Sequence, residues 1–182
     1  MGIVIVLVLI LALVLYGISA YNKLAQERLK VDNQWSQIDI VLKQRSDTIP
    51  NLVQVVSAYA AHEKELLERI SEARSRYMSA KSPDASVRAA ADLSDGLSRL
   101  MAVAENYPEL KSNASFMDLQ KRLADLENKI ADFRQFYNDT VMRYNRLIVT
   151  VPSSLIAKMF GFTQREFFRV EEAEKAAPEI RF

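Results

Sequence analysis

The chain has 182 residues, with 24 lysines and arginines against 23 aspartates and glutamates, and it contains no cysteine. The nearly balanced charge argues against a nucleic-acid-binding surface of one sign, and the missing cysteine excludes disulfides, thiol catalysis and thiolate metal sites. Only four glycines and five prolines occur, which excludes a β protein with many turns and predicts an all-α chain of long helices.

The N-terminal residues 1–22 contain no charged side chain and are mostly isoleucine, valine and leucine. From Ile3 to Tyr21 a helix would be about 28 Å long at ~1.5 Å per residue, close to the ~30 Å hydrocarbon core of a bilayer. We therefore predict a transmembrane anchor over residues 1–22, with Tyr16 and Tyr21 near its interface. A cleaved secretory signal is the alternative, but no basic residue precedes Ile3 and residues 18–20 match a cleavage site poorly.

Charged residues on the two sides of this span predict its orientation. Lys23, Arg28 and Lys30 follow the span, whereas no basic residue precedes it. The positive-inside rule then places the N-terminus outside and the body of the chain in the cytoplasm, in a protein that crosses the membrane once.

Apolar residues after the span recur at helical spacing and predict four helices, at about 23–46, 50–80, 84–106 and 114–149. Pro50 predicts a break between the first two helices, because the residue before a proline avoids the helical conformation. We expect the span to continue directly into the first helix, and residues 23–150 to form an elongated up-down four-helix bundle.

Capping residues predict where the later helices begin. Ser82 and Pro83 are typical of the N-cap and the first position of a helix. Ser115 and Asp118 have the spacing of a capping box ahead of the fourth helix.

The fourth predicted helix has the clearest period, since its apolar residues and one threonine step alternately by three and four, as in a coiled-coil seam. These residues are Phe116, Leu119, Leu123, Leu126, Ile130, Phe133, Tyr137, Thr140, Tyr144 and Leu147. The stretch RQFYNDTVMRYN at 134–145 has the mixed composition of an active site, but its aromatic residues continue this stripe. Asn138 and Asn145, seven residues apart near the seam, are predicted to fix helix register by bonding across the bundle.

Four stretches resemble the LemA family of bacterial membrane-anchored proteins: WSQIDIVLKQRSDTIPNLVQVVSAYAAHEKE (35–65), RLMAVAENYPELKSN (99–113), RQFYNDTVMRYN (134–145) and VPSSLIAKMFGFTQREFF (151–168). The resemblance implies a helical bundle on an N-terminal span in the bacterial inner membrane. It implies no established reaction and transfers no catalytic residue. Some relatives are linked to envelope functions and to the formation of internal membranes.

Residues able to carry out catalysis are few. His62 is the one histidine, so zinc motifs that need two histidines are excluded, and it is followed by the charged residues 63–65 on what we expect to be a solvated face. Gly-rich phosphate loops are absent as well. We predict no catalytic, metal or cofactor site, and a hydrolase with an unrecognised site remains the least favoured alternative.

The C-terminal residues 151–182 are predicted to form an amphipathic segment and tail. If the bundle runs up and down as expected, its aromatic and basic residues lie at the membrane-proximal end and are candidates for the membrane interface: Lys158, Phe160, Phe162, Arg165, Phe167 and Phe168. The alternative is that these side chains pack against the open end of the bundle.

These features together predict a non-enzymatic scaffold or adaptor that acts through its helix faces. The expected partners are the lipid bilayer and other copies of the chain in a homo-oligomer, with another membrane protein as a further candidate, but not nucleic acid. The alternative function is a regulatory or accessory subunit of a membrane protease or another envelope enzyme.

Overall fold

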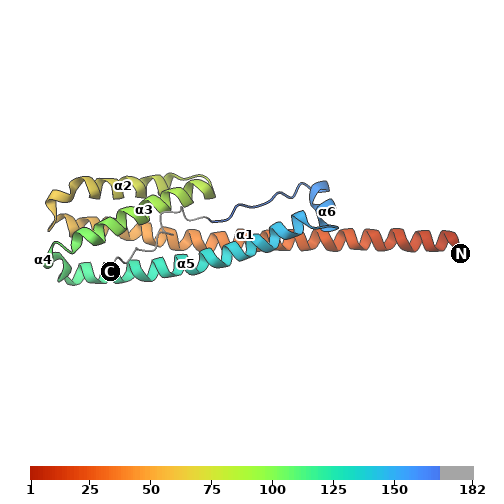
Figure 1. Cartoon of the computed structure of the whole chain (residues 1–182), viewed down its shortest axis with the longest axis horizontal. Coiled ribbons are helices and arrows are strands. Elements are labelled where there is room, and N and C mark those ends of the chain that lie inside the picture. The colour runs from red at the N-terminus through yellow and green to blue at the C-terminus, as the bar shows by residue number, and fades with distance from the viewer. Residues whose placement is uncertain (169–182) are drawn as a thin grey trace, which may run out of the picture. The chain divides into compact units, whose positions relative to one another are not determined.

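The computed structural model describes residues 1–168, and every regular element in that range is a helix (Figure 1). In chain order these are α1 (Gly2–Ser57), the 3-10 turn η1 (Ala61–Glu63), α2 (Lys64–Ser79), α3 (Pro83–Ala104), α4 (Pro108–Lys111), α5 (Ala114–Val149) and α6 (Ser153–Met159). The predicted all-α class is confirmed. Of the predicted tail, residues 169–182 lie outside the described residues.

The described residues divide into two compact units. The first unit contains residues 1–37 and 133–168, and the second contains residues 38–132. Both α1 and α5 therefore contribute to each unit, and the units are described in turn.

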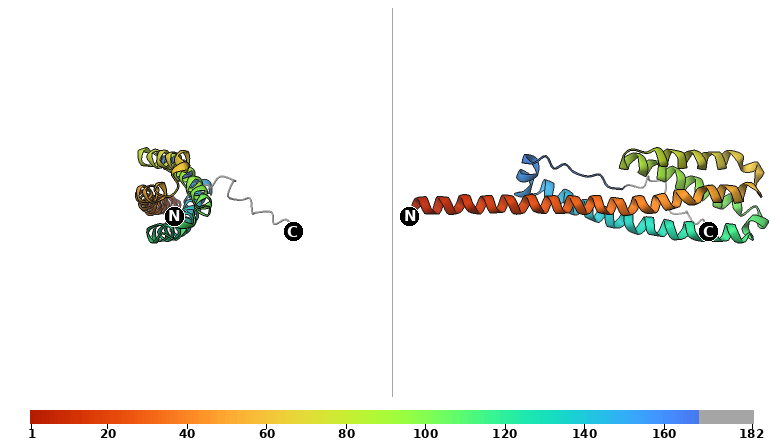
Figure 2. Two further views of the ribbon diagram at one scale, coloured as in Figure 1. Left: turned by 90° about the vertical axis from the view of Figure 1, so that its left-hand side faces the viewer. Right: turned by 180° about the vertical axis from the view of Figure 1, so that it is seen from behind.

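The second unit has one apolar core, to which α1, α2, α3 and α5 all contribute and which Leu110 of α4 closes. Its helices α2 and α3 run antiparallel and lie side by side (Figure 2). Gly96 of α3 allows them to approach closely, because a Cβ added there would lie only 2.9 Å from Cγ1 of the buried Ile70. The core side chains are Ile49, Leu52, Val56, Ala60, Leu67, Ile70, Ala73, Leu93, Leu97, Leu100, Ala104, Leu110, Phe116, Leu119 and Leu123.

The predicted break at Pro50 is wrong, because α1 continues through this proline to Ser57. A proline inside a helix has no N–H for the carbonyl four residues earlier, here that of Ser46. In this chain the Nε of Arg74, on α2, donates to the Ser46 oxygen at 2.8 Å. The missing backbone bond is thus replaced by a side chain, and the turn between the first two helices comes only after Ser57, so that the next α-helix begins at Lys64 rather than near residue 50.

Helix starts in the second unit agree with the local sequence signals in part. The predicted cap of α3 is present, since the Ser82 hydroxyl accepts from the Ala85 N–H at 3.3 Å and Pro83 is the first helical residue. Helix α5 has the predicted bounds, 114–149. Its cap differs, because the Asn113 side-chain oxygen accepts from the Phe116 N–H at 3.0 Å, while Asp118 pairs with Arg122 at 2.8 Å instead of completing a capping box.

In the first unit, the N-terminal part of α1 stands apart from other helices. No residue from Gly2 to Ser19 is buried, and Ala20 and Leu24 are the first that are. The most apolar 18-residue window of this helix has a mean hydropathy of 3.0, so α1 is long and apolar enough to cross a membrane, the one such helix within residues 1–168. The remainder of the unit is the C-terminal part of α5, the short α6 and an extended segment that follows it (Figure 1).

Candidate functional site

Helix α6 lies beside the last turns of the apolar stretch of α1. A Cβ added to Gly17 would lie 3.8 Å from Cδ1 of Ile156, an ordinary contact distance. One helical turn further, the ring of Tyr21 meets Phe160 and Phe162 edge to face, with ring centroids 4.9 and 5.6 Å apart. These contacts hold the middle of α6 and the residues that follow it against the position where a membrane span would end.

The surface formed by α6 and by its C-cap residue, Phe160, is largely apolar and exposed. Leu155, Met159 and Phe160 are 64%, 69% and 56% exposed, and Lys158 lies exposed among them. An apolar surface that carries one ammonium group suits the boundary between lipid headgroups and acyl chains. Of the residues predicted to meet the membrane, Lys158 and Phe160 lie on this exposed surface.

The other candidates lie in or beside the extended segment at residues 163–168, which we call the strap. Phe162, which precedes it, is half-buried against Tyr21, and Phe167 is exposed. Arg165 forms an ion pair with Asp32 of α1 at 2.8 Å.

Phe168 is buried, in contrast to its predicted membrane role. Its ring centroid lies 6.3 Å from that of Trp35, and the Arg134 guanidinium carbon lies 5.9 Å from the Phe168 centroid. Because this ring is enclosed by α1 and α5 residues, it is not available to a bilayer.

Asn138 and Asn145 bind the strap rather than a neighbouring helix. Asn138 donates to the Phe168 carbonyl at 3.1 Å and accepts from the Phe168 N–H at 2.8 Å. Asn145 donates to the Arg165 carbonyl at 2.8 Å and accepts from the Arg165 N–H at 2.9 Å. The hydroxyl of Tyr137 donates to the Glu166 carbonyl at 3.1 Å. Side chains on two turns of α5, seven residues apart, thus hold a non-helical backbone.

The aromatic residues of the 134–145 stretch do not line an open cleft. Tyr137 and Tyr144 are 7% and 1% exposed. Burial raises the pKa of the Tyr144 hydroxyl, an effect that the nearby cations Arg28 and Arg165 partly offset, so this phenol stays neutral at physiological pH. This stretch of α5 therefore packs and positions other segments.

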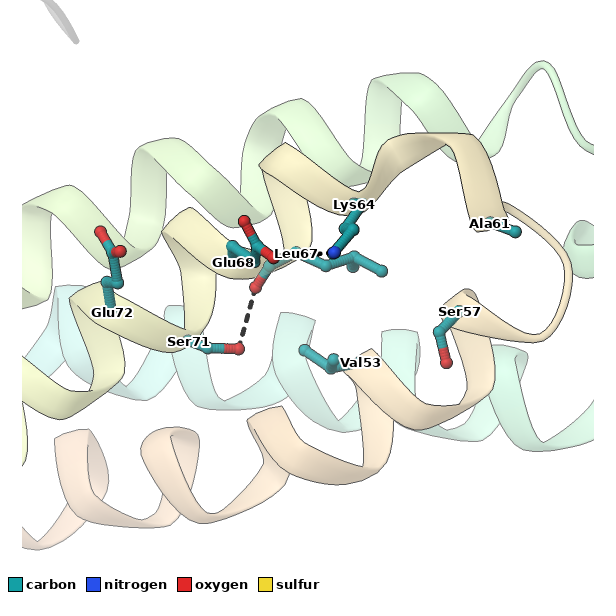
Figure 3. A pocket seen from close by; sticks show the side chains of 8 residues that line it. All are labelled: Val53, Ser57, Ala61, Lys64, Leu67, Glu68, Ser71 and Glu72. Atoms are coloured by element: carbon teal, nitrogen blue, oxygen red, sulfur yellow. Dashed lines mark hydrogen bonds and ion pairs between the residues drawn. The ribbon is translucent and has the colours of Figure 1, made fainter.

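A hollow of about 560 Å³ opens in the second unit between the end of α1 and the start of α2 (Figure 3). Val53 and Leu67 give it an apolar floor. Four of its five polar side chains are bound locally: the Ser71 hydroxyl donates to the Leu67 carbonyl, the Ser57 hydroxyl donates within its own helix, and Lys64 pairs with Glu68 at 3.7 Å. This arrangement provides no pair of groups that could activate a nucleophile.

His62 lines a different hollow, together with Glu63, Glu65 and Arg69. Within residues 1–168, no three carboxylate or histidine side chains lie close enough together to hold a metal ion.

A buried arginine in the second unit was not anticipated from the sequence. Arg45 of α1 is 1% exposed, and its guanidinium donates to Glu127 at 2.6 Å, to the Ser94 hydroxyl at 2.7 Å and to the Ala90 carbonyl at 2.9 Å. Helical periodicity places this residue beside an apolar stripe but does not show that α3 and α5 supply acceptors. Its hydrogen bonds join three helices, α1, α3 and α5.

A family model described as the LemA family matches residues 34–182. This chain belongs to the LemA family. The matched range contains α5 with Asn138 and Asn145, helix α6 and the strap, while the apolar stretch of α1, residues 1–22, precedes it.

Among curated proteins, this LemA-family chain is similar to magnetosome proteins. It is 33% identical over 79 residues to magnetosome protein MamQ of Magnetospirillum gryphiswaldense, and 34% identical over 79 residues to magnetosome proteins MamQ 1 and MamQ 2 of Paramagnetospirillum magneticum. Each matched stretch covers 43% of this chain and 29% of the relative. The chain thus matches less than a third of the length of these relatives.

Proposed function

We propose that this LemA-family protein is a non-enzymatic scaffold or adaptor that crosses the bacterial inner membrane once and keeps its helical body in the cytoplasm. The observation that carries the proposal is the N-terminal part of α1, whose apolar side chains from Ile3 to Leu15 are 53–79% exposed wherever they are large. A surface of this size is stable in lipid and costly in water. The names of the magnetosome relatives support a place at a membrane.

The scaffold acts through the faces of its helices, as an elongated up-down bundle that meets other copies of itself. Anchoring confines the copies to two dimensions and raises their effective concentration, so weak lateral contacts suffice for assembly. In the hollow between α1 and α2 both serine hydroxyls donate to backbone carbonyls and not to a base, which is why we favour binding over catalysis.

Assembly is tested with the full chain in nanodiscs or mild detergent. Because the chain has no cysteine, one cysteine at an exposed site such as Lys81 carries a single fluorophore without background labelling. We expect energy transfer when donor-labelled and acceptor-labelled copies are mixed in detergent, and a mass above that of the monomer. A monomer at every concentration would overturn the proposal, and association with one other protein alone would favour the accessory-subunit alternative.

The same cysteine tests the orientation. With the body in the cytoplasm, a membrane-impermeant maleimide labels position 81 only after the cells are lysed. Labelling of intact spheroplasts would place the body outside.

We also propose that α6 rests on the membrane surface, through Leu155, Met159 and Phe160. The test is a fluorophore on a cysteine at position 155 or 159 of the full chain, in bilayers that contain lipids brominated near the headgroup. We expect quenching at these positions and none at Phe136, a phenylalanine of α5 that is 55% exposed and serves as the matched control. Equal quenching at all three positions, or at none, would overturn this part of the proposal.

A further inference from the structure

The strap is held through its backbone, which is how extended peptides are recognised. Each of the two asparagines forms a pair of hydrogen bonds with one strap residue, accepting from its N–H and donating to its carbonyl. Such bonds do not depend on the side chain of the bound residue, so they fix direction and register without selecting a sequence.

The spacing of the two asparagines matches that of an extended chain. Seven helical residues rise about 10.5 Å at ~1.5 Å each, and three extended residues span about 10 Å at ~3.3 Å each. Residues 138 and 145 accordingly bind residues 168 and 165, in antiparallel order. Two turns of α5 therefore have about the same length as three residues of any extended chain.

Two side-chain positions add selectivity to this backbone recognition. Asp32 receives the Arg165 guanidinium, and Trp35 with Arg134 encloses the Phe168 ring. Between these anchors, Glu166 and Phe167 are exposed. The site consequently selects a basic residue followed three positions later by an aromatic residue.

The strap occupies this site as a ligand would. Most of its residues are exposed, and it follows Gly161, whose φ of 71° turns the chain away from α6. Within the described part of the chain, no backbone-to-backbone hydrogen bond ties residues 163–168 to another element. Each hydrogen bond or ion pair described above between the strap and its site thus involves a side chain on at least one of the two partners. Another extended segment can form the same bonds equally well.

We propose that Asp32, Trp35, Asn138 and Asn145 form a recognition site for extended peptides with a basic residue three positions before an aromatic one, and that residues 163–168 are its built-in occupant. A partner chain with this pattern displaces the strap and binds antiparallel to α5. This goes beyond the scaffold function by naming the ligand class and the site, and it does not require self-assembly.

The test uses the full chain in nanodiscs and a labelled peptide with the sequence of residues 162–168, FTQREFF. An open variant, Arg165→Glu with Phe168→Ala, weakens the built-in strap. We expect the open variant to bind the peptide at least about tenfold more tightly than the parental chain, because the parental strap competes for the site. Release of the strap is followed independently by the fluorescence of Trp35, the one tryptophan of the chain.

A peptide methylated on the backbone nitrogens that correspond to Arg165 and Phe168 is the matched control. It keeps both side chains and the apolar character but lacks the two donors that the asparagines accept. We expect its affinity to fall at least about tenfold, and a similar loss when Asn138→Ala and Asn145→Ala are added to the open variant.

Equal binding of the methylated and unmethylated peptides would overturn the proposal, since adsorption to lipid gives that result. Absence of binding to an open variant with a parental circular-dichroism spectrum would also overturn it. If the double change lowers the helical signal, Arg165→Glu alone gives the same comparison with the Phe168 ring in place.

Discussion

Arg74 and Ser46 are joined by a hydrogen bond from the guanidinium Nε to the backbone carbonyl, at 2.8 Å. The carbonyl is the one that Pro50 leaves without a helical donor. Arg74→Met should therefore destabilise the chain by about 1–3 kcal/mol, the cost of an unsatisfied buried acceptor. In a Pro50→Ala background the restored N–H fills the same place, so the loss from Arg74→Met should be much smaller.

This double-mutant cycle is measured by thermal or chemical unfolding followed by circular dichroism. Arg69, which pairs only with Glu65 one turn away on an exposed surface, provides the control for losing an α2 arginine. Additive effects of Arg74→Met and Pro50→Ala would show that the bond does not compensate for the proline.

The buried guanidinium of Arg45 should be among the most sensitive positions of the second unit. Arg45→Met leaves the Ser94 hydroxyl and the Glu127 carboxylate without this donor and removes one of the two side-chain donors to the Ala90 carbonyl. We expect a loss of about 3–5 kcal/mol in the free energy of unfolding. Glu127→Gln should cost only about 1 kcal/mol, because that side chain is 42% exposed and keeps an acceptor oxygen. Denaturant titrations of both variants measure the difference, and a larger loss for Glu127→Gln would contradict the assignment.

Alkaline pH should destabilise the fold through Tyr77. Burial, followed by the charge of Asp39 and the hydrogen bond to it at 3.1 Å, raises the pKa of Tyr77 above its usual range. Above a pH of about 10 the unfolded chain then loses this proton while the folded chain keeps it, so stability falls as the pH rises.

Tyr77→Phe should flatten this part of the pH dependence. The measurement is the unfolding midpoint of both proteins between about pH 8 and 11. The variant is expected to start lower, because it loses the bond to Asp39, and then to decline less steeply. Parallel curves would show that Tyr77 is not protected from ionisation.

Gly96→Ala should destabilise the contact between α2 and α3. The added methyl group would approach Cγ1 of Ile70 to 2.9 Å, and overpacking of this kind costs about 1–3 kcal/mol, against a gain of about 1 kcal/mol in helix propensity. Ser98→Ala, on an exposed face of α3, serves as the control and should have little effect. In an Ile70→Ala background the penalty for Gly96→Ala should disappear, and its persistence would assign the cost to another contact.

Helix positions were predictable wherever local chemistry decides them. The apolar stripe of α5 gave its bounds, and Ser82 with Pro83 marked the start of α3, because periodicity and caps depend on residues within one or two turns. Pro50 shows the limit of such reasoning. The carbonyl that it leaves without a helical donor is bound by Arg74, which is 24 residues from Pro50 in the sequence and becomes a neighbour only after folding.

The candidate site, too, could be predicted from the sequence only in part. Exposed apolar residues of α6 could be proposed from composition, since they lie in one short amphipathic segment. The roles of Asn138 and Asn145 could not, because a spacing of seven fits a helical partner as well as an extended one. Deciding between the two required the position of the strap, 20 to 30 residues further along the chain.

If α1 spans a bilayer, as we propose, the contact between Ile156 and Gly17 limits how deeply the chain can be immersed in lipid. If α1 moved further into the hydrocarbon, it would carry the ammonium group of Lys158 and the hydroxyls of Ser153 and Ser154 with it, at a cost that grows with depth. A bilayer thicker than the free apolar stretch must therefore thin locally around each molecule. Copies that deform lipid in the same way lower the total deformation by gathering, which would bring them together without any direct protein contact.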